Sequence, residues 1–260
     1  MILCGGIGSR LQEETEFRPK PMLEIGGRPI LWHIMKLYAT YGFQEFILCL
    51  GYKGHVIKEF FLNYQTYQTD FTIRLKNASQ IEYHNHRNGT GEDWKVTLVE
   101  TGLNAQTGAR VAKAAKYVEG EMFCLTYGDG LGNVDLSRLL EFHKKHGKIG
   151  TVTGVRPPGR FGELEMDQEG KALQFNEKPQ VTQGLINGGF FIFDRKFFKR
   201  YLNDREDLVL EQEPLQHLAR DKQLVVYPHA GFWQPMDTYR EFKLLNELWS
   251  SGKAPWKIWN

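Results

Sequence analysis

Short apolar runs alternate with helix-like stretches along most of this 260-residue chain. Apolar residues recur at helical spacing over 30–41, and continuous apolar runs stand at 46–50 and 122–128. Pro29 and Gly42 bound the first helical stretch, as is typical of helix starts and ends. Strands that alternate with helices in this way predict an α/β three-layer fold with a mainly parallel, mixed central sheet, similar to a Rossmann fold.

The second half of the chain carries more strand-like runs than the first. Two alternating segments, 71–75 and 81–84, indicate a hairpin or an edge excursion, and closing helices are expected near 211–221 and 238–250. No linker-like or low-complexity stretch divides the chain. We therefore expect a single domain over 1–260.

Composition narrows the class of protein. Lysine and arginine total 33 against 31 acidic residues, a net charge of +2, which argues against a nucleic-acid binder. Cys4, Cys49 and Cys124 lie in apolar runs without a CxxC motif, which favours a reducing compartment over a zinc site. No apolar run is long enough to span a membrane, and glycines interrupt the apolar start, so neither a membrane helix nor a signal peptide is expected. These features predict a cytoplasmic protein.

Ligands of such sheets bind beyond the carboxyl ends of the strands. The loop after the first strand is glycine-rich: Gly5, Gly6 and Gly8 precede Ser9 and Arg10. Glycines let backbone amides approach an anion, and an arginine can hold two phosphate oxygens. The loop fits neither the P-loop motif nor GxGxxG. The alternative is a tight turn beside solvated cations.

Two aspartates are candidate magnesium ligands. Asp129 stands between Gly128 and Gly130 where a predicted strand ends, and Asp237 precedes the last predicted helix. Magnesium binds through one or two carboxylates together with substrate phosphates. Alternatively, Asp129 belongs to a common Asp-Gly turn, and Asp237 caps the helix that begins near Thr238.

These motifs resemble a known family. GGIGSRL followed by PKPMLEIGGRPIL is similar to the signature of the sugar-1-phosphate nucleotidyltransferases, GGxGTRL and then PKP. Further stretches resemble the glucose-1-phosphate cytidylyltransferases in particular: GYKGHVIKEFF, TYGDG, PPGRFGEL, INGGFF, EQEPL and GFWQPMDT. The chain departs from the signature at Cys4, where alanine is usual, and at Ser9, where threonine is usual.

The resemblance implies roles for particular residues. Arg10 and Lys20 would be catalytic, with Arg10 on the departing pyrophosphate and Lys20 on the phosphate that is attacked. Asp129 and Asp237 would hold Mg²⁺. The residues that it places on the nucleotide are Leu3, Gly5, Gly6, Gly8, Ser9, Arg10, Lys20, Thr107, Arg110 and Gly128. From the residues alone, Thr107 would cap a helix and Arg110 would lie on the surface.

The sugar-phosphate side is assigned in the same way. Glu177 and Lys178 precede a proline, a pattern that more often marks a solvated charge pair in a turn. The resemblance places these two residues, together with Gly162 and Asn187, against the sugar phosphate. It also divides the domain into a nucleotide-binding part, about 1–135, and a sugar-phosphate-binding and C-terminal part, about 136–260.

The implied reaction joins CTP to α-D-glucose 1-phosphate, giving CDP-glucose for CDP-deoxysugar and O-antigen (lipopolysaccharide) synthesis and releasing pyrophosphate. A homo-oligomer is also implied, with no nucleic-acid or membrane partner. A thymidylyl- or uridylyltransferase is the first alternative. A catalytically silent subunit that binds sugar nucleotides is the second, and the presence of the candidate catalytic residues argues against it.

Overall fold

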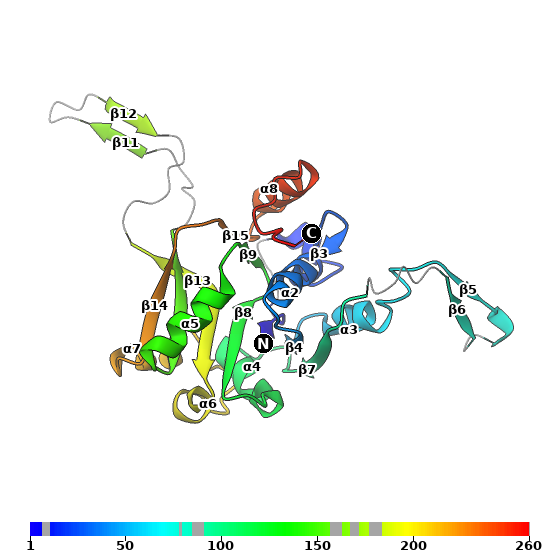
Figure 1. The fold of residues 1–260 in the computed structure, drawn as a ribbon, viewed down its shortest axis with the longest axis horizontal. Helices are drawn as coiled ribbons and strands as arrows, with labels where there is room; N and C mark the ends of the chain where they lie inside the picture. The colour runs from blue at the N-terminus through cyan, green and yellow to red at the C-terminus, as the bar shows by residue number, and fades with distance from the viewer. Residues whose placement is uncertain are drawn as a thin grey trace.

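A computed structural model describes residues 1–6, 11–77, 80–84, 91–156, 163–166, 172–176 and 184–259. A seven-stranded sheet crosses the centre of the molecule (Figure 1). Its strands, in spatial order, are β14 (Leu224–His229), β10 (Gly150–Val155), β13 (Ile186–Asp194), β8 (Met122–Tyr127), β1 (Ile2–Leu3), β4 (Glu45–Leu50) and β7 (Lys95–Glu100). Only β13 runs antiparallel to its neighbours among these strands. The predicted mixed, mainly parallel sheet is confirmed.

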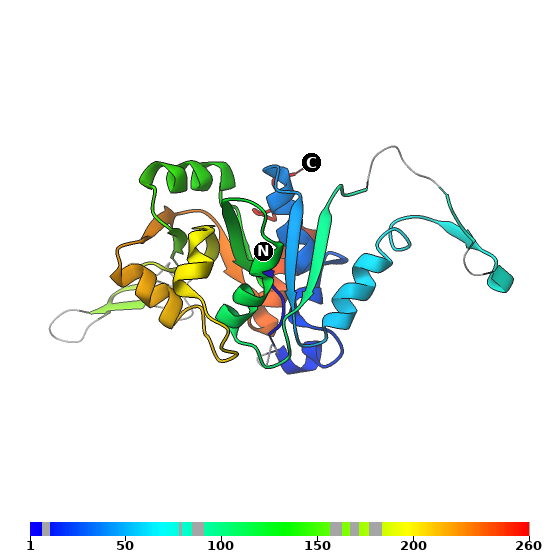
Figure 2. The same cartoon turned by 90° about the horizontal axis from the view of Figure 1, so that it is seen from below.

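Helices cover both faces of this sheet (Figure 2). The α-helices are α1 (Gln12–Thr15), α2 (Ile30–Thr40), α3 (Gly54–Leu62), α4 (Thr107–Ala114), α5 (Leu136–His146), α6 (Lys196–Tyr201), α7 (Glu213–Arg220) and α8 (Tyr239–Ser250). The 3₁₀ turns are η2 (Lys20–Met22), η3 (Leu75–Asn77) and η4 (Ala115–Tyr117). Successive side chains of a strand point to opposite faces, so Leu48 packs with α2 and α5 while Cys49 packs with α4 and α7. The fold therefore has the three layers that the sequence predicts.

In the described part of the chain, four two-stranded sheets accompany the main one: β2 (Glu24–Ile25) with β3 (Arg28–Pro29), β5 (Phe71–Ile73) with β6 (Ile81–Tyr83), β9 (Gly130–Gly132) with β15 (Trp233–Pro235), and β11 (Glu163–Met166) with β12 (Ala172–Asn176). The β5–β6 hairpin confirms the predicted one and projects from the body in Figure 1. The β9–β15 pair, which the sequence analysis did not anticipate, positions the site because it joins the segment after β8 to the segment before α8.

The C-terminal tryptophans pack onto the body of the same chain. Trp256 is fully buried, and Trp249 and Trp259 lie beside His33 of α2, with ring centroids 4.6 and 6.2 Å from the imidazole. The aromatic-rich end is thus part of the core cluster around α2. Within the described part of the chain, no helix is long and apolar enough to cross a membrane.

Candidate active site

A cleft of about 610 Å³ opens at the carboxyl ends of β1 and β8. Its lining includes Leu3, Gly5, Gly6, Lys20, Thr107, Arg110, Tyr127, Gly128, Asp129 and Asp237. A second cavity, of about 430 Å³, lies where β4 and β8 begin and is lined by none of the predicted site residues. Since ligands of parallel sheets bind at the carboxyl ends of the strands, the first cleft is the candidate site.

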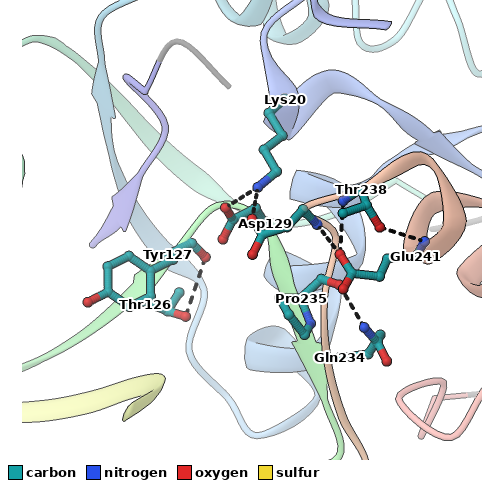
Figure 3. A network of polar contacts seen from close by, with 9 residues as sticks. Lys20, Thr126, Tyr127, Asp129, Gln234, Pro235, Thr238 and Glu241 are labelled. Atoms are coloured by element: carbon teal, nitrogen blue, oxygen red, sulfur yellow. Dashed lines mark hydrogen bonds and ion pairs between the residues drawn. The ribbon is translucent and has the colours of Figure 1, made fainter. Parts of the chain in front are cut away.

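Lys20 lies between the two predicted metal-ligating carboxylates. Its Nζ is 2.7 Å from Oδ2 of Asp129 and 2.6 Å from Oδ1 of Asp237, and Figure 3 shows the lysine reaching across to Asp129. Burial opposes the charge of Lys20, but the two carboxylates outweigh burial and raise its pKa above the ordinary value. One point of the cleft thus attracts a cation from two sides.

Pairing of β9 with β15 brings these aspartates together from positions 108 residues apart in the sequence. Gly130 pairs with Pro235, and the amide of Met236 donates to the carbonyl of Asp129 at 2.8 Å. Both aspartates therefore stand at one end of the same small sheet. A single sequence reveals this neighbourhood only through family resemblance, because neither turn has a local signature of the pairing.

Helix α8 begins with a capping box that leaves the Asp237 carboxylate available to the cleft. The Thr238 hydroxyl accepts from the amide of Glu241, and the Glu241 carboxylate accepts from the amides of Thr238 and Asp237 at 2.9 and 2.6 Å (Figure 3). The N-cap is Thr238, so the interpretation of Asp237 as the helix cap is wrong. Its side chain points to Lys20 instead.

Arg110 is buried, with 5% of its surface exposed, which excludes the surface position that the residues alone favoured. Its guanidinium donates to the carbonyls of Gly5, Leu50, Gly102 and Leu103 and to the Thr101 hydroxyl, at 2.7–3.2 Å. Burial lowers its pKa from the usual arginine value. These contacts fix the start of the glycine-rich loop against the ends of β4 and β7.

Two glycines are required by the position of this guanidinium. A Cβ on Gly5 would lie 2.3 Å from Cζ of Arg110, and one on Gly51 would lie 2.4 Å from its Nη1. From the sequence, Gly5 was expected to let the backbone approach an anion. The structure gives a second reason, because a glycine without a Cβ leaves room for the Arg110 guanidinium.

Thr107 and Asn187 belong to one hydrogen-bond network centred on Tyr127 and Glu211. Thr107 is the first residue of α4, and the N-cap is Gln106, so Thr107 does not cap this helix. Its hydroxyl donates to Glu211, which also accepts from Tyr127, while Asn187 donates to the Tyr127 oxygen. Neither Tyr127 nor Glu211 was predicted as a site residue, although both lie in stretches that carry the family resemblance, TYGDG and EQEPL.

The remaining predicted residues divide into two groups. Leu3, Gly5, Gly6 and Gly128 line the cleft. A side chain at Gly128 would lie 2.7 Å from the Leu3 carbonyl, so this position is restricted to glycine by packing. Outside the described residues lie Gly8, Ser9, Arg10, Gly162, Glu177 and Lys178.

The donor set defines what chemistry the cleft supports. Within the described residues no group of three or more histidine, cysteine or acidic side chains gathers to hold a metal. Two carboxylates that already share one cation fit a hard divalent ion that takes its other ligands from phosphate and water. Cys4 also lines the cleft, but burial raises the pKa of its thiol well above the ordinary value, so it is not a thiolate nucleophile.

A match to known proteins defines the class. The nucleotidyl transferase family model matches residues 1–238, and the chain belongs to this family. Within it, the chain is 48% identical to the glucose-1-phosphate cytidylyltransferase of Salmonella typhi, over all of this chain and 98% of that protein. It is 44% identical to the probable glucose-1-phosphate cytidylyltransferase of Bacillus subtilis (strain 168), over all of this chain and 99% of that protein.

Solved structures of low sequence identity share the fold. HddC from Yersinia pseudotuberculosis, complexed with GMP-PN, superposes with a TM-score of 0.67 at 22% identity, covering 95% of this chain and 97% of that one. A putative glucose-1-phosphate thymidylyltransferase from Bacillus anthracis, in complex with a sucrose, gives 0.68 at 17% identity, covering 95% and 93%. These neighbours confirm the nucleotidyltransferase architecture.

Proposed function

We propose that this chain transfers the cytidylyl group of CTP to α-D-glucose 1-phosphate, forming CDP-glucose and pyrophosphate. A phosphate oxygen of the sugar phosphate attacks the α-phosphorus of CTP while the bond to pyrophosphate breaks. The observation that carries the proposal is the cationic lysine between two carboxylates in a cleft at the strand ends. The identity of 48% across the whole of a cytidylyltransferase supports CTP as the nucleotide and glucose 1-phosphate as the acceptor.

We propose that Asp129 and Asp237 hold Mg²⁺ during this reaction. Both carboxylates already face one cation, the Lys20 ammonium, which supports their fitness for a metal. Bound there, Mg²⁺ would neutralise negative charge on the nucleotide phosphates. The attacking phosphate oxygen is ionised near neutral pH, so no general base is required. Catalysis then depends on positioning and on charge neutralisation.

The protein's own groups supply that positioning. Lys20 lies on a flexible stem in the same cleft and would contact the phosphate that is attacked. The backbones of Gly5 and Gly6 line the cleft, and Arg110 holds Gly5 in place, so we propose that Arg110 acts on the nucleotide through this loop. Leu3, Thr107 and Gly128 line the same cleft, which supports their proposed contact with the nucleotide.

The remaining assignments rest on sequence resemblance. Gly8, Ser9 and Arg10 continue the glycine-rich loop, and Arg10 would hold the departing pyrophosphate. Gly162, Glu177 and Lys178 would contact the sugar phosphate together with Asn187, which is hydrogen-bonded to Tyr127 in the cleft wall. The proposed division of the domain, about 1–135 for the nucleotide and 136–260 for the sugar phosphate, follows the same assignment.

We further propose a homo-oligomer in the cytoplasm, acting in CDP-deoxysugar and O-antigen synthesis. Apolar side chains of the projecting β5–β6 hairpin support association, since Phe71, Ile73 and Ile81 are exposed. The three cysteines are unpaired, which is consistent with a reducing compartment.

The test is pyrophosphate release from glucose 1-phosphate with CTP, UTP, dTTP, GTP or ATP, each with and without Mg²⁺. The proposal predicts release with CTP, abolished by chelation. A strong preference for dTTP or UTP would support the same reaction type but identify a thymidylyl- or uridylyltransferase instead. Binding of CDP-glucose without turnover of any nucleotide would support the silent subunit instead.

A further inference from the structure

Glu211 precedes α7, and its carboxylate is shared between two hydroxyl groups of the cleft wall. Its Oε1 accepts from the Tyr127 hydroxyl at 2.5 Å, and its Oε2 accepts from the Thr107 hydroxyl at 2.6 Å. Tyr127 and Thr107 line the cleft, whereas Glu211 does not. Glu211 therefore stands behind the wall and contacts two of the residues that form it.

The hydrogen bonds continue beyond both hydroxyls. Asn187 donates from Nδ2 to the Tyr127 oxygen at 3.0 Å, and the amide of Leu210 donates to the Thr107 oxygen at 2.9 Å. One connected series thus runs from Asn187, proposed on the sugar-phosphate side, through Tyr127 and Glu211 to Thr107, proposed on the nucleotide side. Its central member is an acceptor with two oxygens, a requirement that a carboxylate meets and a neutral amide does not.

Tyr127 has little freedom to compensate for a lost partner. Its ring packs on Gly189, where a Cβ would lie 2.5 Å from the ring carbon Cδ2. Since Tyr127 stands two residues before Asp129, its placement bears on the carboxylate end of the cleft.

We propose that Glu211 is a positioning residue that holds the nucleotide and sugar-phosphate sides of the cleft in one arrangement, acting through Thr107 and Tyr127. The identity of the two substrates rests on the proposed function. Glu211 has two arms, its hydrogen bond to Thr107 on the nucleotide side and its hydrogen bond to Tyr127 on the sugar-phosphate side. Loss of Glu211 should therefore weaken the binding of both substrates, whereas loss of one arm should weaken mainly the binding of the substrate on that side.

The test is steady-state kinetics of E211Q, with each substrate varied at saturating levels of the other. E211Q keeps the size of the side chain but replaces one acceptor oxygen by a donor. We expect both KM values to rise: by about five- to tenfold for the substrate on the side that loses its acceptor oxygen, and by less for the substrate on the side that keeps an acceptor but loses its negative charge. T107V should raise the KM for CTP alone, and Y127F the KM for glucose 1-phosphate alone.

A merely structural role would lower the active fraction, and so kcat, without moving either KM. E213Q is the matched control, because Glu213 lies two residues away and pairs with Arg205 on the surface. Both KM values of E213Q should stay within twofold of wild type.

If both KM values of E211Q stay within twofold of those of wild type, the proposal is overturned. Should E211Q fail to fold, Y127F removes the same hydrogen bond from the other partner, and an unchanged KM for glucose 1-phosphate would overturn it equally. If wild type and E213Q release no pyrophosphate under the same conditions, it is the proposed function that fails.

Discussion

At the scale of single residues, the site brings three charged side chains into direct contact. One ammonium, that of Lys20, faces two carboxylates 2.7 and 2.6 Å away. A divalent ion bound by Asp129 and Asp237 would satisfy the same carboxylates and release Lys20 toward a phosphate. The carboxylates proposed for the metal and the lysine proposed for the substrate are therefore coupled by direct contact.

Magnesium should raise the unfolding temperature of the ligand-free protein, because a ligand that binds only the folded state stabilises it. At a hundredfold excess over Kd the gain is about 2.7 kcal/mol. D129N and D237N each remove one carboxylate and should lose most of this gain, while D204N on the surface should keep it. Thermal melts with and without Mg²⁺ measure the difference. A full magnesium shift in D237N would show that the metal binds elsewhere.

Replacing Arg110 should destabilise the whole fold, because its five protein acceptors lose their donor together. We expect R110A to lower the free energy of unfolding by about 3–5 kcal/mol. R138A is the control, since Arg138 is mostly exposed. Urea unfolding of both variants gives the comparison, and equal losses would contradict the role assigned to the buried guanidinium.

At the scale of elements, small structural elements position the side chains of the candidate site. The β9–β15 pair places Asp129 beside Asp237, and the capping box of α8 holds the amide of Asp237. Helix α2 and the C-terminal tryptophans form the support behind the β2–β3 turn, where the Trp249 indole packs on Gly26. Strands β9 and β15 have three residues each, and β9 follows closely on β8, so the main sheet helps to place this pair.

Thr238→Ala should weaken the start of α8 by about 1 kcal/mol, the usual loss of an N-cap. It should also raise the Mg²⁺ concentration needed for half-maximal activity, because Asp237 adjoins the cap. Thr238→Ser retains the hydroxyl and should restore both values. Urea titration and a magnesium titration of activity are the measurements. A Ser variant as impaired as the Ala variant would argue against the capping role.

The packing of His33 predicts a loss of stability on acidification. Its Nδ1 accepts from the Trp256 indole at 3.4 Å and its Nε2 faces the Ile25 carbonyl at 2.8 Å, which suits the neutral ring. Burial lowers the pKa of His33 from 6.5 to about 4. Between these values the unfolded state binds the proton and the folded state does not, so stability falls as pH drops from 6.5 toward 4.

The stability slope of H33N over pH 5–6.5 should be shallower than that of wild type by up to about 1.4 kcal/mol per pH unit. H217N, which removes a histidine of α7, should keep the wild-type slope. Chemical denaturation at several pH values measures both slopes. An unchanged slope in H33N would place the acid sensitivity at other groups.

At the scale of the whole molecule, most strands and helices of the main sheet could be predicted because they carry a local pattern, whereas the edge strand β14 and the short helix α6 were not anticipated. The run at 46–50 became β4, and the helical stretch over 30–41 became α2. The pairing of β9 with β15 could not be predicted, because three-residue strands more than 100 positions apart leave no periodic signal. Only the family resemblance assigned Asp129 and Asp237 to the same site.

The position of Arg110 shows where local reasoning fails. A basic residue in the first turn of a helix is expected to be exposed, yet Arg110 is buried because carbonyls from three separate segments of the chain converge on it. Glu211 was missed for the same reason, since its partners come from α4 and β8. Residues whose role is to join distant segments have no signature within their own segment.

The most direct test of the central claim is ³¹P NMR of the wild-type protein with CTP, glucose 1-phosphate and Mg²⁺. The account predicts the phosphorus signals of CDP-glucose and pyrophosphate growing in a one-to-one ratio, with K20A and D129N showing neither at the same enzyme concentration. Release of CDP and inorganic phosphate, or equal product formation by K20A, would contradict the reaction and the site proposed for it.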